Sequence, residues 1–360
     1  MKPFHCLLDK PHLGRFLQGL LPFWGPTGEA ERSAFRLLHA DSDLATLNFS
    51  LINTWTPPKG LLFPQTEALL AYSRQGAADS PEAPCRPAIE RAVILGLRPC
   101  DARSFAALDG HLIDWAKDAG YSRRRESAVL IGLACTSPGP NCFCESVGGG
   151  PFATAGLDAL MIDLGAAYLV EILTERAAEL FKGAAALREA TAADLARARE
   201  AEREALARFE RSLDPVAARE LLEARADEEV WDEAARRCVG CGVCAYFCPT
   251  CYCSVVYNDE LRGQGRRVRA WTSCQFPKFI HQPTGVNLRP TKASRLQRRL
   301  WDKFVEFPER FGEVGCMGCG RCLEACPVDL DMVELVCSLR GKRAACILEL
   351  GGQSAAPAEG

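Results

Sequence analysis

Two cysteine runs hold most of the chemistry that this chain offers. They read Cys238-Val-Gly-Cys-Gly-Val-Cys-Ala-Tyr-Phe-Cys248-Pro249 and Cys316-Met-Gly-Cys-Gly-Arg-Cys-Leu-Glu-Ala-Cys326-Pro327. Both have the spacing Cys-x2-Cys-x2-Cys-x3-Cys-Pro, which in bacterial ferredoxins wraps a [4Fe-4S] cluster and lends its fourth cysteine to the other cluster. Three closely spaced thiolates can curl round one face of a cube, while the fourth points away beyond a turn that the proline restricts. The runs therefore predict two [4Fe-4S] clusters.

The exchange of fourth cysteines decides which thiols belong together. One predicted set is Cys238, Cys241, Cys244 and Cys326, and the other is Cys316, Cys319, Cys322 and Cys248. Zinc sites also use Cys-x2-Cys knuckles, but they need only two of them, so the complete pattern favours iron and sulfur. A disulfide framework is typical of small secreted domains, and the start of this chain lacks the order of a signal peptide.

Four further cysteines follow predicted strands or stand close behind one. The apolar runs 92–97 and 128–134 predict buried strands, and open α/β folds place their sites at the carboxyl ends of such strands. These four predict a third iron-sulfur site: Cys100, Cys135, Cys142 and Cys144. The alternative is that they are buried thiols without a shared role.

Several neighbouring residues leave alternatives open. Asp101 could be an oxygen ligand, could accept a hydrogen bond beside the cluster, or could cap a helix that begins at Ala102. The glycines at 148–150 lack the Rossmann and P-loop patterns, so we interpret them as a flexible loop beside the cluster. Cys6 and Cys85 stand alone and are expected to be small buried hydrophobes.

More thiols lie between the two runs. Cys251 and Cys253 follow the first run, and Cys274 follows a predicted strand at 267–271. These three could form part of another metal site or line an existing one, and their spacing does not distinguish between these two alternatives. The basic stretch 289–299 fits a docking surface or a compensating charge near anionic clusters better than a nucleic-acid contact.

The remaining sequence supplies the elements that position these groups. Residues 1 to about 85 predict mixed α/β structure, with a turn at 55–60 and a short extended piece at 61–64. The run 157–172 predicts a strand or hairpin. Strong helix formers dominate 175–237, where Pro215 divides at least two helices. Residues 328–350 predict a helix with Cys337 and Cys346 buried.

Together these patterns predict a fold in four parts. They are an α/β N-terminal domain over 1–172, a helical connector over 173–237, an α+β two-[4Fe-4S] ferredoxin-like domain over 238–335 with an insertion at 250–315, and a C-terminal helix with a flexible tail over 336–360. The formal charge of -3 argues against a general nucleic-acid surface. The apolar runs are far shorter than the about 20 residues of a membrane-spanning helix. Nineteen cysteines favour metal binding in a reducing cytoplasm.

At these residues the chain resembles the iron-sulfur β subunits of cytoplasmic [NiFe] sulfhydrogenases and the related A subunits of anaerobic sulfite reductases. The likeness runs from about Ile94 to Val328. Its signposts are Arg98-Pro-Cys-Asp101, Cys142-Phe-Cys144, Cys248-Pro-Thr-Cys-Tyr-Cys253, Trp271 with Ser273-Cys274, Arg289-Pro290 and Gly318-Cys-Gly-Arg-Cys322. One departure is Thr272, because the family usually has an aspartate after the tryptophan. No role that rests on that carboxylate carries over.

The resemblance implies a subunit that carries electrons between a flavin subunit that meets NAD(P)H and a separate catalytic subunit. That partner would be a [NiFe]-hydrogenase module or, as the alternative, a sulfite reductase. The resemblance also implies that the four N-terminal cysteines are ligands. The sequence offers no nickel-binding pair near its carboxyl end, no Gly-x-Gly-x-x-Gly after a strand and no Ser-His-Asp order. Two other classes stay open: a reductase that binds substrate at the N-terminal cluster, and a structural zinc protein.

Overall fold

The computed structural model describes residues 3–73, 92–182, 187–224 and 228–339. Its strands are β1 (Phe4–Asp9), β2 (Phe23–Thr27), β3 (Ala34–Leu38), β4 (Thr66–Ser73), β5 (Ala92–Leu97), β6 (Ala128–Leu133), β7 (Ala159–Asp163), β8 (Ala167–Ile172), β9 (Leu187–Glu189), β10 (Ser254–Leu261) and β11 (Gln264–Trp271). Its α-helices are α1 (Lys10–Leu20), α2 (Lys59–Leu62), α3 (Pro99–Asp109), α4 (Ala119–Ser127), α5 (Glu175–Lys182), α6 (Ala192–Leu206), α7 (Pro215–Glu223), α8 (Glu228–Arg237), α9 (Val243–Tyr246), α10 (Lys292–Trp301), α11 (Phe307–Phe311), α12 (Arg321–Glu324) and α13 (Met332–Ser338). Short 3-10 turns are η1 (Ala30–Arg32), η2 (Asp41–Thr46) and η4 (Glu145–Val147), and π-helical turns are η3 (Gly110–Trp115) and η5 (Asp302–Glu306).

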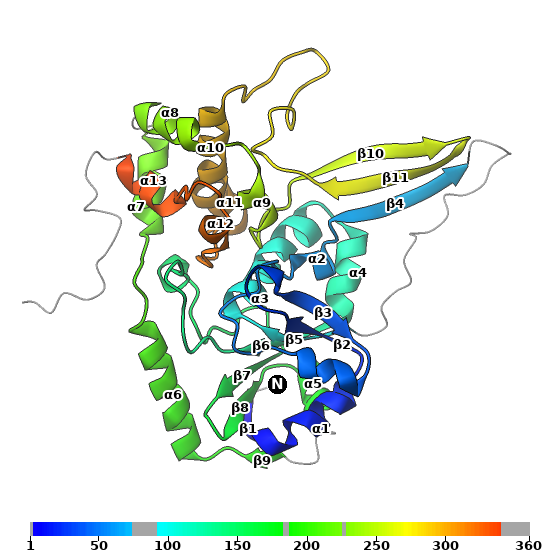
Figure 1. Cartoon of the computed structure of the whole chain (residues 1–360), viewed down its shortest axis with the longest axis vertical. Coiled ribbons are helices and arrows are strands. Elements are labelled where there is room, and N and C mark those ends of the chain that lie inside the picture. The colour runs from blue at the N-terminus through cyan, green and yellow to red at the C-terminus, as the bar shows by residue number, and fades with distance from the viewer. Residues whose placement is uncertain (1–2, 74–91, 183–186, 225–227, 340–360) are drawn as a thin grey trace, which may run out of the picture.

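A mixed sheet forms one end of the elongated molecule, and helices form the other (Figure 1). Within the described residues, the sheet has the strand order β3-β2-β5-β6-β7-β8-β1-β9. Strands β2, β5, β6 and β7 run parallel, and β7 and β8 form an antiparallel hairpin. The structure therefore contains the strands expected at 92–97 and 128–134 and the hairpin expected within 157–172. The carboxyl ends of β5 and β6 share one edge of the sheet.

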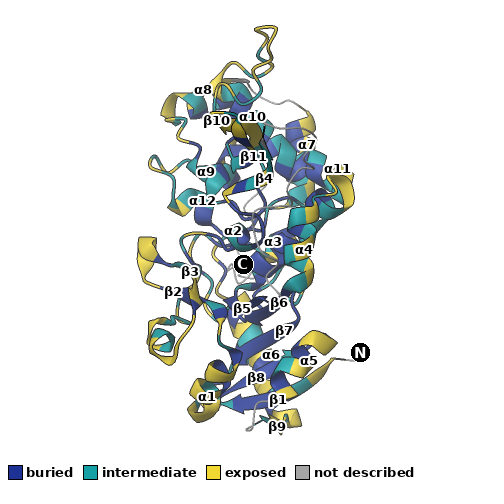
Figure 2. Ribbon diagram, turned by 90° about the vertical axis from the view of Figure 1, so that its right-hand side faces the viewer, coloured by how far each residue is buried: buried dark blue, intermediate teal, exposed yellow. Residues whose placement is uncertain are grey.

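Both faces of this sheet are covered, which explains why its central strands are apolar along their whole length. Along β5, Val93 and Leu95 enter a core with α1 and α5, while Ile94 enters a second core with α3 and α4. Every residue of β5 and β6 is buried (Figure 2). Because the two strands are fixed from both sides, the residues that follow them are held in defined positions.

The segment 175–237 is largely helical, as its composition predicts. Pro215 occupies the first turn of α7, and the Asp214 carboxylate caps that helix by accepting from the amides of Val216 and Ala217. Helix α5 buries Phe181 in a sheet core, and β9 pairs with the edge of β1. The helical prediction is wrong at β9, because the edge of β1 offers backbone hydrogen bonds that a helix there would leave unmade. The domain limits remain a prediction.

The helical end of the molecule packs around a separate core. Helices α7, α8, α10 and α13 meet there around Leu300, Phe304 and Trp231. A three-stranded arm of order β10-β11-β4 extends beside these helices (Figure 1). It joins N-terminal strand β4 to the insertion, and the strand expected at 267–271 lies within β11.

Two local predictions from the sequence are wrong. Residues 59–62 form helix α2 instead of an extended piece, because Pro64 constrains only Phe63 before it and leaves the preceding turn free to close. Helix α3 begins at Pro99, three residues before the expected start, because proline is well suited to the first helical turn.

The isolated cysteines among the described residues lie in the core. Cys6 and Cys337 are buried, as expected. Cys85, Cys346 and the tail 351–360 lie outside the described residues. No helix in the described ranges has the length and apolar character required to cross a membrane.

Candidate metal centres

The first group of thiols lies where the two cysteine runs meet at the helical end. A cavity of about 40 Å³ is lined by Cys238, Cys241, Cys244, Cys326 and also Cys322. We call the first four the outer site. The first run supplies Cys238 and Cys241 from the loop before α9 and Cys244 from α9 itself, and the second run supplies Cys326 from the turn after α12. These two short helices contact each other. The structure thus brings together the set that cross-ligation predicts.

The second predicted set is also brought together, and we call it the middle site: Cys248, Cys316, Cys319 and Cys322. Burial raises the pKa of Cys322 to about 12, and the nearby Cys316 and Cys248 add to the shift. Burial likewise raises the pKa of Cys319, with Cys248 and Cys322 as neighbours. Because Cys322 also lines the outer cavity, the outer and middle sites are adjacent.

The third set forms a separate pocket at the carboxyl edge of the sheet. Cys100, Cys135, Cys142 and Cys144 line one cavity of about 20 Å³, and we call this set the sheet-edge site. Cys100 lies in the first turn of α3 after β5, and Cys135 lies just past the end of β6. The same cavity is lined by Cys319 of the middle site. The middle site is therefore adjacent to both of the other sites.

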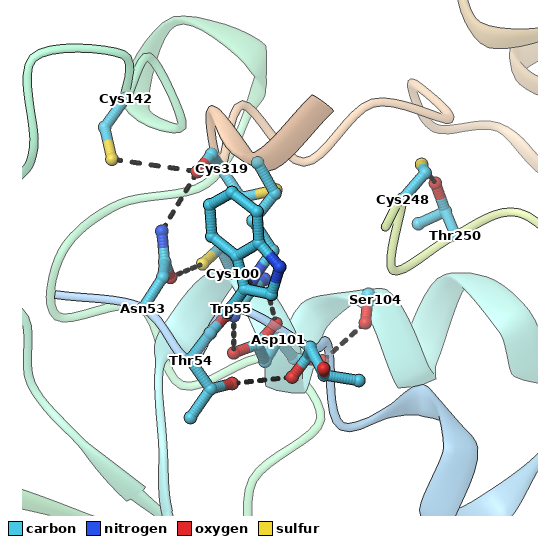
Figure 3. Close-up of polar contacts among 12 residues, drawn as sticks. Asn53, Thr54, Trp55, Cys100, Asp101, Ser104, Cys142, Cys248, Thr250 and Cys319 are labelled. Atoms are coloured by element: carbon cyan, nitrogen blue, oxygen red, sulfur yellow. Dashed lines mark hydrogen bonds and ion pairs between the residues drawn. The ribbon is translucent and has the colours of Figure 1, made fainter. Parts of the chain in front are cut away.

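Direct contacts join the middle site to the sheet-edge site (Figure 3). The Asn53 amide donates to the Cys319 carbonyl at 3.0 Å, and its oxygen lies 3.7 Å from the Cys100 sulfur. The Cys142 sulfur lies 3.9 Å from the same Cys319 carbonyl. Asn53 comes from the first 85 residues, where the sequence shows no chemical motif, so sequence reasoning missed it.

Glycine allows the two loops to approach so closely. Gly318 has a φ of +62°, and a Cβ placed there would lie 2.6 Å from the Cys144 Cα. Its carbonyl accepts from the Phe143 amide at 2.8 Å. Any larger residue would push the loop of the middle site away from the loop that carries Cys142 and Cys144.

A buried ion pair also connects the middle site to the sheet-edge site. Arg321, in the second cysteine run, binds both carboxylate oxygens of Asp101 at 2.6 and 2.8 Å, and both side chains are 1% exposed. Arg321 also donates to the Thr54 carbonyl at 2.7 Å. Of the alternatives that the sequence left open for Asp101, the structure supports a hydrogen-bond acceptor beside the thiols. It does not support a helix cap.

Burial favours the protonated form of three predicted ligand thiols. It raises the pKa of Cys142 to about 11, of Cys244 to about 11 and of Cys144 to about 12. Iron binding requires the thiolate form, so cluster assembly must release these protons.

The thiols within the insertion fall into pairs. The Cys253 and Cys274 thiols hydrogen-bond to each other, and Cys251 pairs with Cys248. Among the described side chains, no three His, Cys, Asp or Glu groups converge on a point that suits one metal ion. The structure therefore does not gather Cys251, Cys253 and Cys274 around a single ion, and their role in metal binding stays a prediction.

Three buried cations surround the Cys248 and Cys251 pair. The Arg299 guanidinium lies 3.3 Å from the Cys251 sulfur, Lys303 donates to the Thr250 hydroxyl at 2.9 Å, and Lys59 donates to the Cys251 carbonyl at 3.0 Å. None of the three forms an ion pair with a carboxylate of the described ranges. Buried charge without a counter-charge is costly. An anionic iron-sulfur cluster held by cysteine thiolates, including that of Cys248, fits this surplus of positive charge.

The basic stretch at 289–299 is less exposed than its composition suggests. Arg295 and Arg299 are buried, so the prediction of a docking surface is wrong for these two residues. Their helix α10 turns them into the core, where Arg299 also donates to the Cys244 carbonyl at 2.6 Å. The alternative, a compensating charge beside the thiols, agrees with this position.

Comparison with known proteins identifies the type of domain in this chain and then the family to which the chain belongs. Residues 237–330 match the model of the 4Fe-4S dicluster domain, so this part of the chain is an iron-sulfur domain. Sulfhydrogenase 2 subunit beta of Pyrococcus furiosus is 31% identical over 250 residues, which cover 69% of this chain and 74% of that protein. The chain belongs to the family of sulfhydrogenase β subunits, as the resemblance in its motifs predicted.

Proposed function

We propose that this chain is a non-catalytic subunit that relays electrons through three [4Fe-4S] clusters. In this proposal a flavin subunit that meets NAD(P)H lies at one end of the relay and a [NiFe]-hydrogenase module at the other. Such clusters accept and release single electrons, at potentials that the surrounding charge, hydrogen bonds and burial determine. The chain itself would hold the twelve cysteine ligands, keep water away from them and fix the order of the sites.

One observation carries this proposal: the three groups of thiols are neighbours in series, the outer site next to the middle site and the middle site next to the sheet-edge site. Cys322 of the middle site lines the outer cavity, and Cys319 of the middle site lines the sheet-edge cavity. A relay needs neighbouring centres at short and fixed separations. The buried pair of Arg321 with Asp101 and the close approach at Gly318 supply that rigidity.

The outer site is the best candidate for exchange with a partner subunit. Cys241 is exposed, and Val239 beside it is 61% exposed, whereas the described thiols of the other two sites are buried or half-buried. A partner that docks over this loop would bring its own redox group close to the first thiols of the row. The name of the relative from Pyrococcus furiosus favours a hydrogenase over a sulfite reductase as the catalytic partner.

The test uses the anaerobic complex with its partner subunits. The isolated chain should be brown and should neither oxidise H2 nor reduce NAD(P)+, while the complex should link the two reactions. Cys135→Ser should interrupt that link, and Cys6→Ala, a change at a buried cysteine outside all three sites, should not. Hydrogenase activity in the isolated chain, or a fully active Cys135→Ser complex, would overturn the proposal.

A further inference from the structure

The charges around the three thiol sites are not evenly distributed. Lys59, Arg299 and Lys303 come from α2, α10 and η5, elements far apart in the sequence, and each is at most 3% exposed. All three lie near Cys248, a predicted ligand of the middle site. We call these three residues the cationic cradle.

The contacts hold the cradle in a fixed position. Thr250, which is fully buried, accepts from Lys303 and lies 3.2 Å from the Cys248 sulfur, while its own hydroxyl donates to the Gly315 carbonyl at 2.6 Å. Lys59 donates to the carbonyls of Ala245 and Cys251. Its ammonium group also lies 4.2 Å from the centre of the Trp271 ring. These ammonium groups therefore cannot turn away towards solvent.

The other two sites have less unpaired positive charge. At the sheet-edge site, the Arg321 charge is matched by Asp101, which leaves Arg98 as a half-buried cation bound to main-chain carbonyls such as that of Ala134. At the outer site, Lys292 donates to the Cys238 carbonyl from an exposed position, where solvent screens its charge. Arg299 reaches both the outer and middle sites, but the two lysines lie beside Cys248.

We propose that the cationic cradle makes the middle cluster the most easily reduced of the three. This inference rests on the proposed function, because it presupposes a cluster at each site. Reduction adds one electron, and hence one negative charge, to a [4Fe-4S] cluster that already carries net negative charge with its four thiolates. No bond or proton needs to move, and the partner subunit supplies the electron. Buried cations stabilise the reduced form more than the oxidised form, and low polarity around them strengthens the effect.

A relay with this profile would hold its electron in the centre. The middle cluster would retain the electron because the outer and sheet-edge clusters are less easily reduced. The electron would stay there until a partner subunit can accept it. Transfer of the electron from the middle cluster to either of the other two clusters would require a small increase in free energy.

The test is a potentiometric titration of the full anaerobic chain, followed by EPR spectroscopy. Cys241→Ser, Cys319→Ser and Cys135→Ser assign the signals to the outer, middle and sheet-edge sites. In the wild type, the middle signal should appear first as the potential is lowered. In Lys303→Gln, its ratio of reduced to oxidised cluster at a fixed potential should fall at least tenfold, or about 59 mV. Lys303→Arg should keep the wild-type value, and so should Lys182→Gln, a matched change at an exposed lysine on α5.

The outcomes separate this inference from the proposed function. Iron and sulfide content below three clusters per wild-type chain would contradict the proposed function itself. Three clusters, with another signal appearing before the middle one or with the middle signal unmoved in both Lys303→Gln and Lys59→Gln, would overturn only the inference about the cationic cradle. If neither variant retains its clusters, the order of reduction in the wild type still decides the question.

Discussion

The helical end and the sheet edge gather their thiols in different ways. At the helical end, eight cysteines lie in two short runs whose local turns place them, with glycines at positive φ on both sides of Cys241 and Cys319. At the sheet edge, Cys100 and Cys135 meet because β5 and β6 are parallel neighbours that end together, and the loop before η4 brings Cys142 and Cys144 to the same cavity. Local spacing alone is sufficient to predict the first kind of site. The second kind depends on tertiary structure.

The middle site links these two constructions. Its Cys319 carbonyl accepts from Asn53, and its Arg321 binds Asp101 in the first turn of α3. The two regions can therefore form one electron path only if these contacts between the middle site and the sheet edge are stable. The first two of the following predictions test these contacts, and the third tests a separate contact between η3 and the insertion.

The largest effect should come from breaking the buried ion pair. Arg321→Met leaves the Asp101 carboxylate buried without its counter-charge, which costs on the order of 3–5 kcal/mol in free energy of unfolding. Chemical denaturation of the anaerobic protein, followed by circular dichroism and cluster absorbance, measures the loss. The sheet-edge cluster should be released at lower denaturant concentration than in the wild type.

The double variant Arg321→Met with Asp101→Leu supplies the control. Because it removes both charges, it should recover most of the lost stability. A double variant as unstable as Arg321→Met alone would show that the guanidinium acts through its contact with the Thr54 carbonyl instead of the ion pair.

A smaller effect should follow from adding one methyl group at the contact between loops. Gly318→Ala places a Cβ against the Cys144 backbone at a positive φ, and should cost about 1–3 kcal/mol. Gly240→Ala is the matched change in the first run, where φ is +73° and no atom lies within 4 Å of the added Cβ. Equal losses of stability in the two variants would contradict a tight contact at Gly318.

A third prediction concerns pH. His111 on η3 stacks on Tyr252 of the insertion with ring centroids 3.5 Å apart, and burial lowers its pKa to about 4 from an ordinary 6.5. A lowered pKa means that the stabilising contribution is complete above pH 6.5 and is lost as pH falls towards 4. Asp302, Arg310 and Lys303 also act on this ring. Unfolding curves between pH 7 and 4 should show this loss in the wild type and a weaker one in His111→Gln.

The sequence predicts more of the thiol sites than of what surrounds them. Repeated spacing predicts all eight C-terminal cysteines, and apolar runs predict the two strands that deliver Cys100 and Cys135. Asn53 and Lys59 could not be found, because their hydrogen bonds to the Cys319 and Ala245 carbonyls join residues more than 180 positions apart. No local pattern records such a contact.

Secondary structure is likewise predictable where the local sequence determines it and is not where distant contacts determine it. The buried strands β5 and β6 are predicted because their apolar runs are long and unbroken, whereas β9 lies in a segment with strong helix formers. Its strand conformation is a response to the open edge of β1. Tertiary contacts likewise decide that Arg295 and Arg299 face inwards from a stretch whose composition favours the surface.

Iron and acid-labile sulfide analysis, with EPR spin counting on the reduced protein, tests most directly whether three clusters occupy one row of sites. Prepared without oxygen, the wild-type chain should hold about twelve iron atoms, three clusters of four. Cys135→Ser should lose about a third of the iron and one EPR signal. A colourless preparation that contains zinc or no metal, or a Cys135→Ser chain with the same iron content as the wild type, would contradict the account.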